Sequence, residues 1–224
     1  MTSRVRAREV SVTPERLERW LAGFGARHGD LTVHAGADRV LIDAADGARA
    51  ECAVPFPPLR IVENRPYAGL LTHVLQDRVV GVVLVRRGGF AAGVFAGREP
   101  LATKVGSRYV QGRTAAGGQS QQRFARRREK QTREAYAAAA RVVEATVLPH
   151  RDDLEAVVVG GDRTGVDRVL AEPRLAPLRA LVVPPFLAVP DPKLTVLLRT
   201  PDQFRSVRIR LTEPAADERA TAEV

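Results

Sequence analysis

The sequence predicts an α/β (α+β) fold: a mixed β-sheet with helices packed on it, preceded by a small amino-terminal α+β appendage. Three patterns support this prediction. The run Val79–Val85 is continuously apolar, which is typical of a strand in the centre of a sheet. Residues 17–24 carry large apolar side chains at positions i, i+3, i+4 and i+7, the spacing of an amphipathic helix. Residues 120–146 form a long helical pattern that changes from strongly basic to apolar.

The amino-terminal appendage, residues 1–60, begins with a helix and continues with short strands. Thr13 is the expected N-cap with Pro14 in the first turn, and Gly29 is the expected end of the helix. Turns that contain Gly and Asp separate three expected strands, Leu31–Val33, Arg39–Ile42 and Ala48–Val54. Prolines at positions 55, 57 and 58 then break the pattern, and we place a domain boundary there.

The central domain, residues 61–185, contains most of the predicted sheet and the long helix. A helix is expected over Pro66–Gln76. The elements that follow are strands Val79–Val85, Phe90–Phe95 and Glu99–Val105, the long helix, strand Ala156–Val159, a helix near Val166–Ala171 and strand Ala180–Val183. Three strands, helix, strand, helix and strand is the order of an RNase H-like core. Residues 186–224 are expected to hold a strand over Phe204–Leu211, compatible with pairing to the amino-terminal sheet, and a disordered tail from Glu213.

The long helix divides into two halves with different roles. In its second half, Ala139, Val143 and Val147 stand at helical spacing and suit packing on the sheet. Between Ser120 and Arg133 the only large apolar residue is Phe124, so this half is expected to project from the core. At ~1.5 Å per residue, such a half-helix places the loop before it roughly 20 Å outward.

The formal net charge of +9 is concentrated around this projecting half. Between Lys104 and Arg133 there are nine basic residues and one acidic residue, a net charge of +8. A near-neutral chain with one basic segment indicates a surface that contacts phosphates, although a charge run by itself is more often a solvated helix face. The candidate RNA-binding residues are Arg113, Arg123, Arg126, Arg127, Arg128, Lys130 and Arg133.

Gly117, Gly118 and Gln119 stand immediately before the basic half-helix and are the candidate catalytic residues. Two glycines let the backbone approach a ligand closely. A glutamine supplies both a donor and an acceptor, but it is too weak a base to take a proton from water. These residue types, beside a basic helix, suit a loop that enters a tight, RNA-lined site.

The run from Gly117 to Arg127 resembles the GGQ loop and following helix of the archaeal and eukaryotic class I release factors, whose central domain is RNase H-like. The bacterial release factors also carry GGQ, but on an unrelated fold. With one GGQ domain and short flanks, the chain is similar to the VLRF peptidyl-tRNA hydrolases, in particular their actinobacterial branch, over about residues 70–147. The resemblance implies a cytoplasmic, codon-independent hydrolase that releases nascent chains from stalled large ribosomal subunits. It implies the large subunit and peptidyl-tRNA as partners, a monomer, and no cofactor or metal.

Several alternatives remain open at this stage. Some relatives show a GGSQ-type spacing, which leaves Gln121 as a second candidate beside Gln119, although Gln121 and Gln122 are more simply helix surface. A non-catalytic ribosome- or RNA-binding factor of the same fold is the alternative function. The substrate could be a split subunit, an intact ribosome or free peptidyl-tRNA.

Other site classes have little support in the sequence. The four histidines show no metal-ligand spacing, and the central strands lack the clustered carboxylates of an RNase H-type nuclease. Gly160–Gly165 lacks the Lys-Ser/Thr of a phosphate-binding P-loop and is better explained as a strand-to-helix turn. Cys52 is the only cysteine, so no internal disulfide can form, and neither a membrane span nor a signal peptide is expected.

Overall fold

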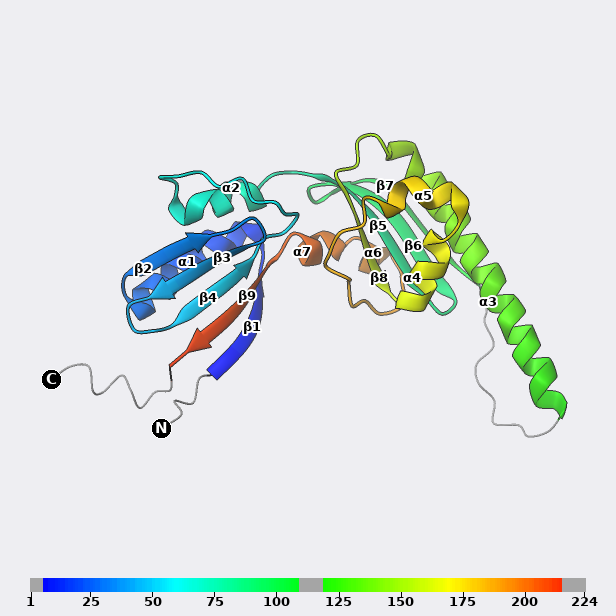
Figure 1. Cartoon of the computed structure of the whole chain (residues 1–224). Helices are drawn as coiled ribbons and strands as arrows, with labels where there is room; N and C mark the ends of the chain where they lie inside the picture. Colours follow the sequence, from blue (N-terminus) through cyan, green and yellow to red (C-terminus); the bar gives the residue numbers. More distant parts are fainter. Residues whose placement is uncertain (1–5, 109–118, 215–224) are drawn as a thin grey trace. The chain divides into compact units, whose positions relative to one another are not determined.

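The computed structural model describes residues 6–108 and 119–214, with only the backbone of residue 6 and of residues 119–125. The chain divides into two compact units (Figure 1). Unit 1 comprises Met1–Gln76 together with Arg205–Val224, and unit 2 comprises Asp77–Phe204. Unit 2 is therefore inserted into the sequence of unit 1.

Unit 1 contains a five-stranded antiparallel sheet with the strand order β1-β9-β4-β3-β2. Its strands are β1 (Arg6–Val12), β2 (Leu31–Ala35), β3 (Arg39–Ala44), β4 (Arg49–Ala53) and β9 (Val207–Glu213). The first and last strands of the chain pair along their whole length, from Arg6 opposite Glu213 to Val12 opposite Val207. The predicted carboxy-terminal strand and its pairing with the amino-terminal sheet are confirmed, whereas β1 was not predicted.

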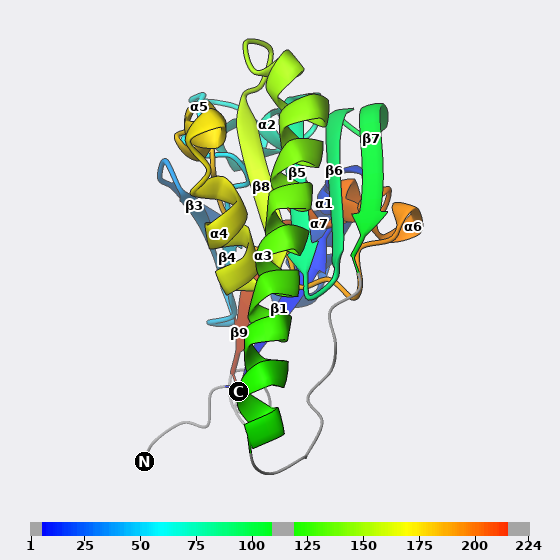
Figure 2. The same ribbon diagram turned by 90° about the vertical axis from the view of Figure 1, so that its right-hand side faces the viewer.

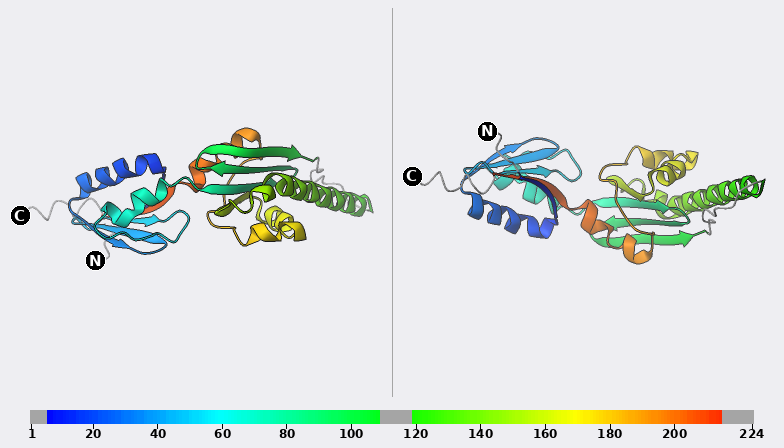
Figure 3. Two further views of the ribbon diagram at one scale, coloured as in Figure 1. Left: turned by 90° about the horizontal axis from the view of Figure 1, so that it is seen from above. Right: turned by 90° about the horizontal axis from the view of Figure 1, so that it is seen from below.

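Helices α1 (Pro14–His28) and α2 (Leu70–Val74) cover one face of this sheet (Figure 3). Thr13 is the N-cap of α1 in extended conformation, and Gly29 ends the helix with a φ of 84°. That positive φ explains the glycine, because residues with a Cβ adopt it only with strain. Leu17, Leu21 and Phe24 of α1 are fully buried against the inward-facing residues of β3, β4 and β9.

Unit 2 contains a four-stranded mixed sheet with the order β7-β6-β5-β8. Its strands are β5 (Val79–Arg86), β6 (Gly89–Ala96), β7 (Glu99–Ser107) and β8 (Ala156–Gly161). The first three form an antiparallel meander, and β8 runs parallel to β5. This is the predicted RNase H-like arrangement, and the bounds of these strands agree with the sequence pattern to within two residues.

Helices lie on both faces of the unit 2 sheet (Figure 3). One face carries α3 (Gln119–Thr146), α4 (Arg163–Leu170) and α5 (Ala176–Arg179), with 3-10 turns η2 (Leu148–His150) and η3 (Pro173–Leu175) beside them. The opposite face carries α6 (Leu194–Leu197), and α7 (Thr200–Phe204) follows it. Phe204 meets Phe95 of β6 edge-on, with ring centroids 6.5 Å apart. The short helices α5, α6 and α7 were not predicted.

Two elements predicted from the sequence, one strand and one helix, are wrong: the structure has other elements at these positions. The strand expected over Ala180–Val183 is reduced to single bridges, Val157 to Val182 and Gly160 to Leu187. Pro184 and Pro185 lie between these bridges and have no N–H to donate, which interrupts a ladder. The helix expected over Pro66–Gln76 is a 3-10 turn η1 (Pro66–Gly69) followed by the short α2, because Gly69 has a φ of 89°.

The unit boundaries also differ from the predicted ones. They lie at 76/77 and 204/205 rather than near residues 60 and 185. The segment after the prolines at 55, 57 and 58 still packs on unit 1, since Leu59, Leu70 and Val74 belong to its core. Glu213 belongs to β9, so the disordered tail expected from this residue does not start there, and residues 215–224 lie outside the described part. No helix in the described ranges combines the length and the apolar character that crossing a bilayer requires.

Candidate functional site

The second half of α3 is firmly attached to unit 2. Its buried residues are mostly alanines, which let the helix approach β6 and β7 closely: Ala135, Ala138, Ala139, Ala140 and Val143. Near the carboxy-terminal end of α3, the Glu144 carboxylate forms an ion pair with the guanidinium of Arg174 in η3, with an N–O distance of 3.1 Å. This half therefore provides a rigid base for whatever the first half carries.

Tyr136 marks the place where α3 leaves the core. The ring is half-buried, and its Cε1 lies 3.2 Å from the position that a Cβ on Gly165 would occupy. A side chain at Gly165 in α4 would thus push against the tyrosine. Burial, and then the nearby Asp162 carboxylate, raise the pKa of the Tyr136 phenol above its ordinary value, so the ring stays neutral.

The first half of α3 continues past the end of the sheet (Figure 2). We call residues 119–133 of this helix the basic arm. No side chain from Arg126 to Glu134 is buried, in agreement with the predicted projection. Arg126, Arg127, Lys130 and Arg133 are exposed, and Arg128 is half-exposed.

Four arginines of the basic arm have no ion-pair partner among the residues that the structure describes. Lys130 lies 3.9 Å from Glu134, an i,i+4 pair in which both side chains are largely exposed. Such a pair contributes about 0.3–0.5 kcal/mol or less and is screened by salt. Arg126, Arg127, Arg128 and Arg133 form no ion pair with another residue that the structure describes. These guanidinium groups are therefore free to bind phosphates.

Of the predicted catalytic residues, the structure describes Gln119, at the start of this arm. Gln119 is the first residue of α3, and Gln119 and Arg123 are described in their backbone only. Gly117, Gly118 and Arg113 lie outside the described residues. The roles of these five residues remain predictions from the sequence.

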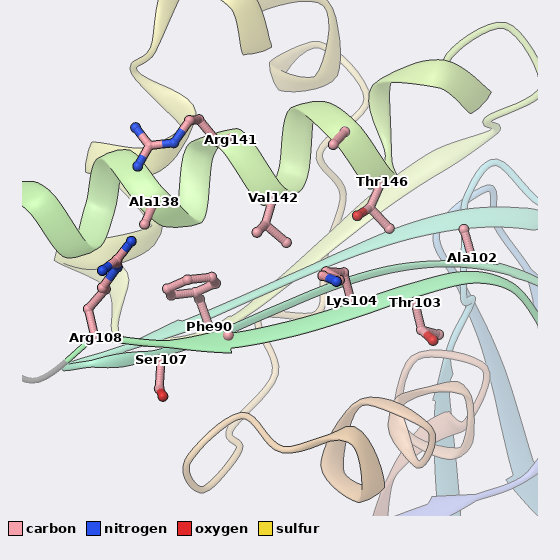
Figure 4. A pocket seen from close by; sticks show the side chains of 12 residues that line it. Phe90, Ala102, Thr103, Lys104, Ser107, Arg108, Ala138, Arg141, Val142 and Thr146 are labelled. Atoms are coloured by element: carbon pink, nitrogen blue, oxygen red, sulfur yellow. The ribbon is translucent and has the colours of Figure 1, made fainter.

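A groove that the sequence did not reveal runs between α3 and the edge strand β7 (Figure 4). Its volume is about 740 Å³. Arg141 of α3 lines it and belongs to no predicted site. Its spacing of eleven residues from Lys130, about three helical turns, is the signal that could have placed both on one face.

The remaining candidates from the sequence have structural explanations. Gly160–Gly165 is the predicted strand-to-helix turn between β8 and α4. Within it the Gly161 amide donates to the Leu187 carbonyl oxygen at 3.0 Å and the Asp162 amide to that of Val85 at 2.7 Å, so neither amide is available to a ligand. Within the described ranges, no three His, Cys, Asp or Glu side chains gather in a way that could hold a metal ion.

Comparison with known families decides the assignment of the chain. Residues 78–210, more than half of the sequence, match the model of the actinobacterial and chloroflexi VLRF1 release factor family. The chain belongs to this family. The matched range covers all of α3 and reaches into β9, so the VLRF1 match and the predicted resemblance agree. No protein of curated function matches the chain by sequence.

Several solved structures match parts of the chain at low sequence identity. An archaeal protein matches with a TM-score of 0.39 and 14% identity over 73% of this chain and 51% of that one. The archaeal translation termination factor aRF1 matches with a TM-score of 0.38 and 15% identity over the same shares. The Vms1 mitochondrial localization core matches with a TM-score of 0.45 and 9% identity over 87% of this chain and 80% of that one. The chain thus spans about half the length of the first two.

Proposed function

We propose that this protein is a codon-independent peptidyl-tRNA hydrolase, which releases nascent chains from stalled large ribosomal subunits in the cytoplasm. The observation that carries the proposal is the position of Gln119. This residue begins a helix whose first half extends beyond the sheet and presents exposed cations that have no strong partner among the described residues. Membership of a release-factor family supports a role in translation.

The basic arm would dock on rRNA and on the tRNA. Its cations replace the counterions of the phosphates, which favours binding and makes it sensitive to salt. The rigid base formed by the second half of α3 then fixes how far the Gly117–Gln119 loop enters the site. A narrow ribosomal site that excludes the whole domain would still admit a single helix and its loop, roughly 10–12 Å wide.

At the reacting ester, the chain would supply positioning and hydrogen bonds. Gly117 and Gly118 let the backbone approach the ester bond. The Gln119 N–H donates to the oxygen that becomes negatively charged, while its side chain helps to orient the attacking water. The water oxygen bonds to the carbonyl carbon, the bond to the tRNA ribose oxygen breaks, and a proton from the water passes to that ribose oxygen. Ribosomal RNA and the terminal ribose would complete the site, without a cofactor.

A single-turnover release assay tests the proposal. Purified large subunits that carry labelled peptidyl-tRNA, without mRNA, are mixed with excess protein, and released peptide is measured over time. We expect release well above the rate without protein. Free peptidyl-tRNA and intact ribosomes with peptidyl-tRNA, assayed in parallel, identify the preferred substrate.

A chain that binds these subunits tightly but releases no peptide above background would overturn the hydrolase. That outcome would instead assign the protein to the non-catalytic ribosome-binding factors.

A further inference from the structure

The groove between α3 and β7 has an apolar floor and a basic rim. Small and apolar side chains form the floor: Phe90, Ala102, Ala138, Val142 and Ala145. Gly106 of β7 leaves room for the Phe90 ring in this floor, because a Cβ at position 106 would collide with the ring. In Figure 4, Phe90, Lys104 and Arg108 point from the strands toward α3, whereas Thr103 and Ser107 point to the other side of the sheet.

Three cations surround this floor: Lys104, Arg108 and Arg141. None of their side chains forms an ion pair or hydrogen bond with another residue that the structure describes. No carboxylate lines the groove among the described residues. Like charges gathered without compensation are unfavourable, so the arrangement suits an anionic ligand.

The rim of the groove continues into the basic arm. A second hollow of about 460 Å³ shares Arg108 and Arg141 with the groove and extends along α3 to Gln131 and Glu134. At about 100° per residue, Arg127, Lys130 and Arg141 stand within about 60° of one another around the helix axis. One face of α3 therefore carries these three cations from the middle of the arm to the groove, with Glu134, the i,i+4 partner of Lys130, as the one acidic residue that lines the second hollow among those described.

We propose that this groove is a second RNA-binding site, in which Lys104, Arg108 and Arg141 contact the phosphodiester backbone and the apolar floor accepts a ribose or base. The inference rests on the proposed function for its choice of RNA, and it adds residues that the arm does not contain. An RNA strand held there would fix the rotation of the domain about α3. The arm alone leaves that rotation free, since its cations lie on a single narrow helix.

Continuity with the arm favours RNA over an acidic peptide. The lining cations extend in one line with the basic arm, as a phosphate backbone requires, and the volume of the groove lies in the range that holds a nucleotide-sized group. A peptide would instead be expected to pair with the free edge of β7 and need not involve α3 beyond the groove.

Binding of a short fluorescent single-stranded RNA to the full chain, measured by anisotropy at several salt concentrations, tests the inference. The Arg108→Glu/Arg141→Glu double variant should weaken binding by about tenfold or more and flatten the salt dependence. Ala145→Leu, at an exposed position lining the groove, should weaken binding without changing the salt dependence. Arg179→Glu, an exposed arginine on α5 outside the groove, should bind like the wild type. Thermal unfolding of each variant shows that it is folded.

Three results would overturn the RNA site. The first is wild-type affinity in both groove variants. The second is weaker binding in Arg108→Glu/Arg141→Glu but not in Ala145→Leu, because the cations would then attract RNA without the groove being occupied. The third is a peptide rich in Glu and Leu that binds more tightly than the RNA and loses binding in Ala145→Leu. None of these measurements requires peptide release, so a failure of the hydrolase proposal would be seen separately.

Discussion

Val147 packs directly over Gly81: a Cβ on Gly81 would stand 2.9 Å from the Val147 Cγ1. Val147 is fully buried and follows the last residue of α3, while Gly81 lies in the central strand β5. The absence of a side chain at position 81 therefore allows the end of α3 to rest on the sheet, and this contact helps to hold the base of the basic arm.

Gly81→Ala should lower the free energy of unfolding of unit 2 by about 1–3 kcal/mol, because the added methyl group overpacks the contact. Val147→Ala removes the opposing methyl groups and leaves a small cavity. In the double variant, the two changes should compensate in part. Denaturant unfolding of the four proteins gives the coupling between the sites, and strictly additive losses would contradict the contact.

Gln119→Ala should abolish most of the release from large subunits while leaving subunit binding and thermal stability close to wild type. Under the proposed mechanism, the variant removes the side chain that orients water, at the start of a helix half that projects beyond the sheet. Gln121→Ala is the matched control and should keep most activity. If Gln121→Ala abolishes release and Gln119→Ala keeps most of it, Gln121 is the catalytic glutamine.

Gly118→Ala should impair release about as severely as the loss of Gln119. A Cβ at this position restricts φ and adds bulk where, under the proposed mechanism, the backbone approaches the ester. Subunit binding, measured separately, should change little. Release at the wild-type rate would mean that this loop does not enter a tight site.

Charge reversal of Arg126, Arg127 and Lys130 separates docking from chemistry. Binding to large subunits should weaken steeply, and each lost phosphate contact should reduce the slope of log K against log salt by about one unit. Release at saturating protein should fall much less, because the Gly117–Gln119 loop is unchanged. Arg179→Glu serves as the control for a change in net charge. If the affinity for large subunits and its salt dependence are both unchanged, the arm is a solvent-exposed helix face that does not contact RNA.

Stability of unit 1 should depend on pH through Glu15. Burial alone would raise the pKa of this carboxyl, but hydrogen bonds from its own backbone N–H and from Thr13, together with Arg205 at 3.0 Å, lower it overall. A pKa that is lower in the folded state means that the stabilisation is complete above the unfolded value, about 4.3, and is lost as pH falls through the folded value.

Glu15→Gln should therefore flatten the loss of stability of unit 1 below about pH 5. Urea unfolding at a series of pH values measures this. Glu18→Gln, an exposed neighbour on α1 without an ion pair to a described residue, should follow the wild type. Equal pH dependence in Glu15→Gln and the wild type would show that the pair with Arg205 contributes nothing.

Much of unit 2 could be predicted because its signals are local. The apolar run of β5, the glycine-containing turns of the meander and the switch from basic to apolar residues along α3 each reside in a few consecutive residues. The segment near Ala180 was mispredicted because its apolar residues resemble a buried strand, while Pro184 and Pro185 restrict it to bridges.

The missed features depend on partners far along the chain. β1 has the sequence RAREVSV, with few large apolar residues, and becomes a strand through pairing with β9, about two hundred positions later. The groove beside β7 could not be predicted because Arg141 and Lys104 come together only when α3 lies across the meander. The basic arm could be predicted, since its charges adjoin one another in the sequence. Its catalytic assignment still depends on the assays above.

The insertion of unit 2 between the strands of unit 1 sets an order on folding during synthesis. All strands and the long helix of unit 2 have been made by the time residue 161 is added. The sheet of unit 1 still lacks β9 at that point, and β9 separates β1 from β4 and contributes Val207, Ile209 and Leu211 to the core. The amino-terminal part of unit 1 therefore cannot complete its sheet until β9 has been synthesised. Until then Leu17, Leu21 and Phe24 of α1 are incompletely covered. Premature truncation before residue 207 would leave a chain with a complete unit 2 sheet and an exposed, aggregation-prone unit 1.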